Sequence, residues 1–174
     1  DREGACRARR EAQAQPLVGA EPAFLATTRL REMTPELKQN VQQAVPFFAI
    51  RNMVDSLAFY MEGLGFTMRD KWIDEGVLRW CCLELGGAAL MLQETRSELY
   101  DSSVTVGGGV SICFMCRDAL AMYDQAHMAG LEPNEPFVGN SLWVTRLHDP
   151  DGYRIEFEGP TDVPEGTRLS EHRG

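Results

Sequence analysis

Residues 147–158 read LHDPDGYRIEFE, and they join a tight turn to an alternating strand. In the turn, residues 149–152, Pro presets φ, Asp bonds its own backbone and Gly permits a positive φ. The side chains that follow alternate between an apolar face, with Tyr153, Ile155 and Phe157, and a charged face, with Arg154, Glu156 and Glu158. This pattern predicts a sheet with a helix on one side and a polar region, such as a cavity, on the other.

The composition of the whole chain limits its class. Its 174 residues, 44% of them hydrophobic, suffice for one domain with a real core. No apolar run approaches the roughly 18 residues that a membrane span needs, so we expect a soluble protein without a membrane partner. A formal net charge of -9 disfavours nucleic acid as a partner. The five cysteines show no disulfide-like spacing, which predicts reduced thiols in the cytoplasm.

An internal repeat organises most of the chain. Residues 45–94 and 109–158 are each expected to run strand, helix and three strands. The sequence FAIRN at residues 48–52 aligns with FMCRD at residues 114–118, an offset of 66. Two glycine pairs follow at an offset of 65, namely Gly65 with Gly130 and Gly87 with Gly152, so the second helix is one residue shorter. Three anchors in the same order indicate an internal duplication.

The segments around the two modules have a different character. Residues 1–33 are rich in Arg, Ala, Gln and Glu and are predicted to be a disordered leader. Residues 34–159 are expected to form a single domain, which begins with a short helix to about residue 43. The polar residues 95–108 are predicted to link the modules. Residues 160–174 are predicted to be a tail that lies over the surface or is disordered.

The two faces of the outer strands differ in composition. One face of each strand is apolar and suits packing against the two expected helices. The opposite faces mix apolar and polar side chains, as a small-molecule cavity requires, although a solvated sheet face would show the same pattern. These mixed faces contain Val45, Phe47, Ala49, Ala89, Met91, Gln93, Ser111, Cys113, Met115, Arg154, Glu156 and Glu158.

The repeated module, the helix start at residues 52–60 and the DPDGYRIEF motif at residues 149–157 together resemble the vicinal oxygen chelate superfamily. That group includes glyoxalase I, extradiol dioxygenases, fosfomycin-resistance enzymes and bleomycin-resistance proteins. The resemblance covers residues 45–158. It implies an α+β fold in which two tandem βαβββ modules form a curved mixed sheet around a cavity.

The resemblance also implies where a metal would bind. Metal enzymes of the family take two ligands from each module, at positions that fall here on Val45, Met91, Ser111 and Glu156. Only Glu156 binds a hard divalent cation well, while a catalytic metal site usually has about three protein ligands. None of the three His residues lies at a ligand position.

This ligand set implies a metal-free binding protein of the bleomycin-resistance type, with no cofactor and no catalytic residue. Such proteins sequester a small molecule in a cleft shared by two subunits, so a homodimer is expected. The alternative is a lyase or dioxygenase that holds Zn, Ni, Mn or Fe through an atypical ligand set. A third reading is a module with a vestigial cavity that serves protein association.

The expected cavity residues come from both modules. They are Phe47, Trp80, Met91, Gln93, Ser111, Cys113, Trp143, Arg154 and Glu156. Glu156 is expected to pair with a cationic ligand or with Arg154. Trp80 and Trp143 occupy comparable places if the turn before the last strand is two residues longer than Gly86-Gly87.

Overall fold

The structure is a computed structural model that describes residues 40, 42–95 and 107–174. The predicted leader at residues 1–33, most of the predicted helix at residues 34–43 and most of the predicted linker lie outside the described residues. Both modules belong to one unit, Ala44–Gly174. No helix within the described ranges is long and apolar enough to cross a membrane.

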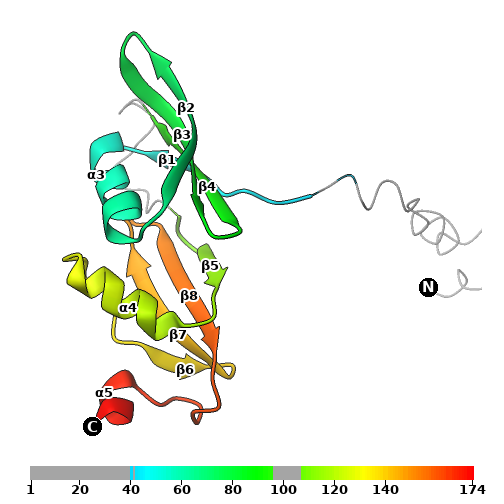
Figure 1. Ribbon diagram of the computed structural model, residues 1–174, viewed down its shortest axis with the longest axis vertical. Coiled ribbons are helices and arrows are strands. Elements are labelled where there is room, and N and C mark those ends of the chain that lie inside the picture. The colour runs from blue at the N-terminus through cyan, green and yellow to red at the C-terminus, as the bar shows by residue number, and fades with distance from the viewer. Residues whose placement is uncertain (1–39, 41, 96–106) are drawn as a thin grey trace, which may run out of the picture. The chain divides into compact units, whose positions relative to one another are not determined.

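The first module begins with β1 (Phe47–Ile50) and α3 (Met53–Leu57) (Figure 1). The helix starts after Asn52 because the Asn52 side chain accepts hydrogen bonds from the backbone N–H groups of Val54 and Asp55. The chain continues as the π-helix η1 (Ala58–Gly63). Three strands follow in the order β2 (Thr67–Asp74), β3 (Val77–Leu85) and β4 (Ala88–Glu94).

The second module repeats this order with β5 (Ser111–Met115) and α4 (Ala119–Met128). Asp118 caps α4 by accepting a hydrogen bond from the backbone N–H of Ala121. The remaining strands are β6 (Phe137–Gly139), β7 (Leu142–His148) and β8 (Arg154–Pro160).

The predicted fold class and its two modules are confirmed. Within the described residues, strand pairing forms two four-stranded mixed sheets, one in each module, in place of the single curved sheet that was expected. The strand orders, β1-β4-β3-β2 and β5-β8-β7-β6, are equivalent. In each sheet the first strand runs parallel to the last strand of its own module.

The π-helical segment η1 accounts for the extra residue in the first module. A π-helical turn inside an α-helix accommodates one additional residue. The corresponding helix of the second module, α4, is regular α-helix. Both helices then end at a glycine in the left-handed region, with φ of 81° at Gly65 and 80° at Gly130. The change of offset from 66 to 65 therefore has a structural cause.

The apolar strand faces form the core beneath the helices, as predicted. Phe48, Ile50, Leu90, Leu92, Ile155 and Phe157 are all buried there. Helix α4 contacts β7 and β8, and α3 contacts β4. The faces away from the helices are called here the open faces of the first and second sheets.

The carboxylates of the DPDG turn hold the two modules together. Asp149 and Asp151 are both buried. The hydroxyl of Tyr60 donates to Asp149 Oδ2 at 3.0 Å, and the backbone N–H of Arg51 donates to Asp151 Oδ1 at 3.0 Å. The motif that predicted the fold therefore also fixes the second module against the start of the first.

Tyr153, the residue after this turn, adds an aromatic contact between the modules. Its ring stacks on Phe48 with centroids 4.1 Å apart and planes within 7°. Its hydroxyl donates to the backbone carbonyl of Ala49 at 3.1 Å. The turn thus carries both the polar and the apolar part of this junction.

The C-terminal residues pack on the second module. The backbone N–H of Val138 donates to the Thr167 carbonyl at 2.9 Å, and that of Leu169 donates to the Pro136 carbonyl at 3.0 Å. Leu169 begins the short helix α5 (Leu169–Arg173) and is buried. These contacts hold the end of the chain beside β6.

Candidate functional site

The open face of the first sheet carries an aromatic platform. Strand register arranges its side chains in two rows across the sheet, Ala49, Gln93, Trp80 and Trp72 in one and Phe47, Met91, Cys82 and Asp70 in the other. Phe47 is 55% exposed and Trp72 is 53% exposed. Phe47 on β1 and Trp72 on β2 lie on opposite edge strands of the sheet, with Met91 on β4 and Trp80 on β3 between them.

The open face of the second sheet is charged and centres on Glu156. Glu156 lies between Cys113 on β5 and Arg146 on β7. Arg154 lies beside Ser111, two residues before Glu156 on the same strand. The predicted site residues therefore divide between the two open faces. The open face of the second sheet holds Ser111, Cys113, Arg154 and Glu156. That of the first sheet holds Phe47, Trp80, Met91 and Gln93.

Glu156 is a buried carboxylate with an internal partner. Its Oε1 accepts a hydrogen bond from Arg146 Nε at 2.7 Å and lies 2.6 Å from Arg146 Nη2 in an ion pair. Arg154 Nε is farther away, 3.9 Å from Oε2. Burial alone raises the pKa of Glu156, but hydrogen bonds from Arg146 and Ser111 and the two guanidinium charges outweigh it, so the pKa lies below its usual value. The expected ion pair with Arg154 is present at the longer distance of 3.9 Å, Arg146 is the nearer partner, and the expected pairing with a cationic ligand stays a prediction.

Arg146 and Phe137 belong to this face although neither was among the expected site residues. The guanidinium of Arg146 lies over the Phe137 ring, 5.6 Å from its centroid, in cation–π geometry. Arg154 in turn donates through Nε to the Ser111 hydroxyl. Arg146 pairs with Glu156 through the register of β7 and β8, which alternation along residues 142–148 does not set.

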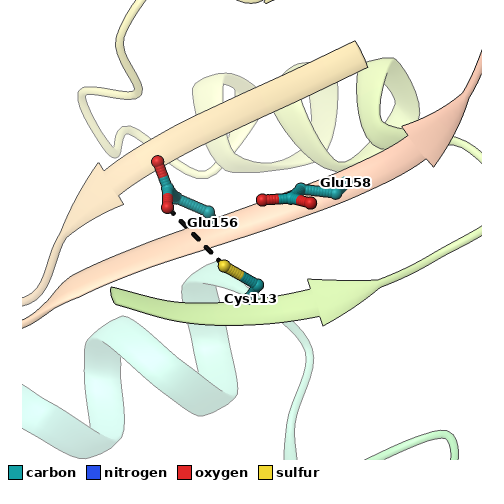
Figure 2. A group of neighbouring side chains, drawn as sticks. All are labelled: Cys113, Glu156 and Glu158. Carbon is teal, nitrogen blue, oxygen red and sulfur yellow. Dashed lines mark hydrogen bonds between the residues drawn. The ribbon is translucent and has the colours of Figure 1, made fainter. Parts of the chain in front are cut away.

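A thiol and two carboxylates gather beside this ion pair (Figure 2). One ligand atom from each of Cys113, Glu156 and Glu158 lies within 4.8 Å of the other two. Cys113 Sγ is 3.7 Å from Glu156 Oε2 and donates to it. Burial and the adjacent Glu158 and Glu156 raise the pKa of the Cys113 thiol to about 11. The thiol therefore stays protonated at neutral pH and serves as a donor.

Comparison with known families decides the classification. Residues 44–157 match the model of the glyoxalase/bleomycin resistance protein/dioxygenase superfamily. The chain belongs to this superfamily. The resemblance inferred from the motifs is thereby confirmed over nearly the same residues. No curated protein matches the chain in sequence.

Solved structures of superfamily members share the fold. A bleomycin-binding protein complexed with bleomycin is 22% identical, with a TM-score of 0.53 over 68% of this chain and 98% of that one. A bleomycin resistance determinant encoded on the transposon Tn5 is 22% identical, with a TM-score of 0.54 over 71% and 100% of the two chains. TnmS3, an antibiotic binding protein from Streptomyces sp. CB03234, is 18% identical, with a TM-score of 0.53 over 70% and 98%. At these identities the likeness shows the fold alone.

The superfamily's metal positions do not form a suitable ligand set in this chain. Val45 precedes β1 and Met91 lies on the first sheet, while Ser111 and Glu156 lie on the second. Val has no donor atom and the Met thioether is a soft ligand. Oε1 of Glu156 already accepts a hydrogen bond from Arg146 Nε and forms an ion pair with the same guanidinium. The side chains at these four positions therefore do not fit a hard divalent metal.

Trp143 is corrected from a cavity residue to a core residue. It is 6% exposed and belongs to the hydrophobic core on the helix side of the second sheet. Trp80 pairs with Gln93, and Glu158, the counterpart of Gln93, pairs with Val144, so the second connection is longer by one residue rather than the assumed two. An odd difference reverses the face, since side chains alternate along a strand. Trp80, by contrast, lies on the open face beside Gln93.

Proposed function

We propose that the protein binds a small molecule on the open faces of its two sheets, without a metal and without bond-making chemistry. The observation that carries this proposal is the aromatic platform, the side chains of Phe47, Trp72 and Trp80 spread across the open face of the first sheet. Trp80 in this set lies beside the amide of Gln93. Flat aromatic surfaces bind planar ligands by stacking, and a few polar groups set the orientation. The bleomycin-binding and antibiotic-binding proteins of the same fold support this class of ligand.

The second sheet contributes a preorganised polar surface to the proposed site. Because Glu156 is buried while Arg146 and Arg154 are partly exposed, the groups that face a ligand are guanidinium N–H donors and the carboxylate of Glu158. Neither Arg146 nor Glu156 is free to move alone, since each neutralises the other. A ligand with both acceptor and cationic groups suits this surface better than a simple cation.

A homodimer would complete the site. The exposed aromatic residues on the first sheet require cover, and in a cleft shared by two subunits the second sheet of a partner copy provides it. We further propose a cytoplasmic location, which the free thiols of Cys81, Cys82, Cys113 and Cys116 support.

Calorimetry tests the binding proposal. Metal-free bleomycin is titrated into protein that has been treated with a chelator, and we expect saturable heat from the wild type. Phe47→Ala should weaken binding about tenfold or more, because it removes a stacking surface. Met128→Ala is the matched control, since Met128 is an exposed apolar side chain on helix α4. No heat and no thermal shift with the wild type would contradict a function of the bleomycin-binding type.

Metal analysis separates this proposal from a metal-dependent lyase or dioxygenase. The cluster of Cys113, Glu156 and Glu158 is the specific feature that favours the alternative. Protein purified without chelator is expected to hold well under one equivalent of transition metal. About one tightly held metal per chain, lost in Glu156→Gln, would instead support the enzyme.

A further inference from the structure

The two modules meet each other through equivalent turns that carry different side chains. At the offset of 65, residues 151–153 (Asp, Gly, Tyr) correspond to residues 86–88 (Gly, Gly, Ala). Each turn is therefore expected to lie against the start of the other module. Figure 1 agrees, with the β3–β4 turn beside β5.

The filled junction shows what the second-module turn provides. The Tyr153 ring stacks on Phe48 at 4.1 Å. The Asp151 carboxylate accepts the backbone N–H of Arg51 at 3.0 Å and lies 3.6 Å from Arg51 Nε. An aromatic ring and a carboxylate thus occupy this junction.

The other junction retains the receiving residues but lacks a ring and a carboxylate from the turn. Its phenylalanine, Phe114, packs instead against Phe66 and Phe157, with centroids 5.6 Å and 5.4 Å away. At the offset of 66, Phe48 corresponds to Phe114 and Arg51 corresponds to Arg117. The counterpart of Tyr153 is Ala88, and that of Asp151 is Gly86. The β3–β4 turn therefore brings neither a ring to the phenylalanine nor a carboxylate to the arginine.

A cavity lies where the missing groups would be. Its volume is about 790 Å³, and its lining includes Gly86, Ala88, Phe114 and Arg117. Pockets for small ligands span roughly 300–1,000 Å³, so the space suits a compact molecule. Cys116 and Met122 add sulfur atoms to the lining, and sulfur packs favourably against the edge of an aromatic ring.

Arg117 is the charged group of this cavity. Its side chain is exposed, and it forms no ion pair with any residue that the structure describes. An unpaired guanidinium beside an apolar wall selects an anion, and a carboxylate matches its geometry.

We propose that this cavity is a second ligand site, which binds a small aromatic carboxylic acid. The ligand ring packs on Phe114 as Tyr153 packs on Phe48, and its carboxylate pairs with Arg117 as Asp151 pairs with Arg51. Cys113 of the second open face also borders this cavity, so shifts at Gly86 and Gly87 of the β3–β4 turn distinguish this site from the proposed function.

The probe that tests this site is 4-hydroxyphenylacetate, which combines the tyrosine ring with a carboxylate. It is added to ¹⁵N-labelled full-length protein up to about 10 mM, a range suited to a ligand with so few atoms. We expect saturable amide shifts at Gly86, Gly87, Phe114 and Arg117. The neutral 4-hydroxyphenylacetamide should bind about tenfold more weakly, because it lacks the charge for Arg117.

Two substitutions probe the two halves of the site. Ala88→Tyr restores the residue found in the filled junction and should abolish binding, whereas the small Ala88→Ser should retain it. Arg117→Gln should weaken binding about tenfold, and the control Arg69→Gln, at an exposed arginine of β2, should not.

Three outcomes would overturn the proposal. They are equal binding of the acid by wild-type and Ala88→Tyr protein, equal affinity for the acid and the amide, and no shift at the β3–β4 turn over the whole titration. The comparison of acid and amide uses wild-type protein, so the test does not depend on the folding of any variant.

Discussion

At the scale of single residues, Asp149 accepts three hydrogen bonds at the junction between the modules. It accepts the hydroxyl of Tyr60 and the backbone N–H groups of Asp151 and Tyr153. Asp149→Ala leaves these three donors without an acceptor and should lower the free energy of unfolding by about 2–4 kcal/mol. Asp149→Asn keeps an acceptor oxygen and should change it by less than about 1 kcal/mol at pH 7. Urea denaturation measures both.

The raised pKa of Asp149 also predicts the direction in which stability changes with pH. Burial is the largest cause of the raised pKa of Asp149, so the folded state favours its protonated form. Its contribution to stability is therefore fully present below the unfolded pKa and is lost as pH rises through the folded pKa. Relative to Asp149→Asn, the wild type should lose stability as pH rises from about 4. A difference between the two proteins that is constant over pH 3–7 would contradict this.

The Arg146–Glu156 pair should change stability with pH in the opposite direction to Asp149. The pKa of Glu156 is lowered, so its contribution is present above the unfolded pKa and is lost as pH falls through the folded one. Arg146→Gln leaves a buried carboxylate without its cation and should cost about 1–2 kcal/mol at pH 7, after allowance for solvent screening at the partly exposed arginine. Thermal unfolding should show this cost shrinking at acid pH. A cost that grows on acidification would refute the pairing.

At the scale of elements, equivalent helix starts use different caps. Asn52 accepts from two backbone N–H groups and Asp118 from one. Asn52→Ala and Asp118→Ala should each lower the free energy of unfolding by about 1 kcal/mol. Equilibrium denaturation measures both costs, and Asp118→Asn, which preserves the cap, is the control. A null effect for both alanine variants would show that packing alone defines these helices.

The elements also show what sequence predicts well. The turn and strand at residues 149–157 are specified locally, by Pro, Gly and alternation, and they appear where predicted. Trp143 was misplaced because its face depends on the parity of a connection, which local patterns do not set. The Arg146–Glu156 pair depends on the register set by the same connection and was missed for the same reason. The cavity beside Ala88 follows from comparing the two halves of the chain, together with the packing that only the structure supplies.

At the scale of the whole molecule, we expect the protein to self-associate, because its open faces expose large aromatic side chains. Sedimentation velocity should show a dimer at micromolar concentration, since the exposed platform needs a partner surface. Phe47→Glu places a charge on that platform and should shift the equilibrium toward monomer, while Val54→Glu, at an exposed position of α3, should not. A wild-type monomer at all concentrations would contradict a shared cleft.

The proposed binding to the open faces is tested most directly by mapping the bound ligand. Amide shifts of the ¹⁵N-labelled protein are recorded with metal-free bleomycin in the presence of a chelator. We predict that the shifts concentrate on both open faces, at Phe47, Gln93, Cys113 and Glu156. Shifts that appear only after a divalent metal is added, or that avoid both faces, would contradict the account.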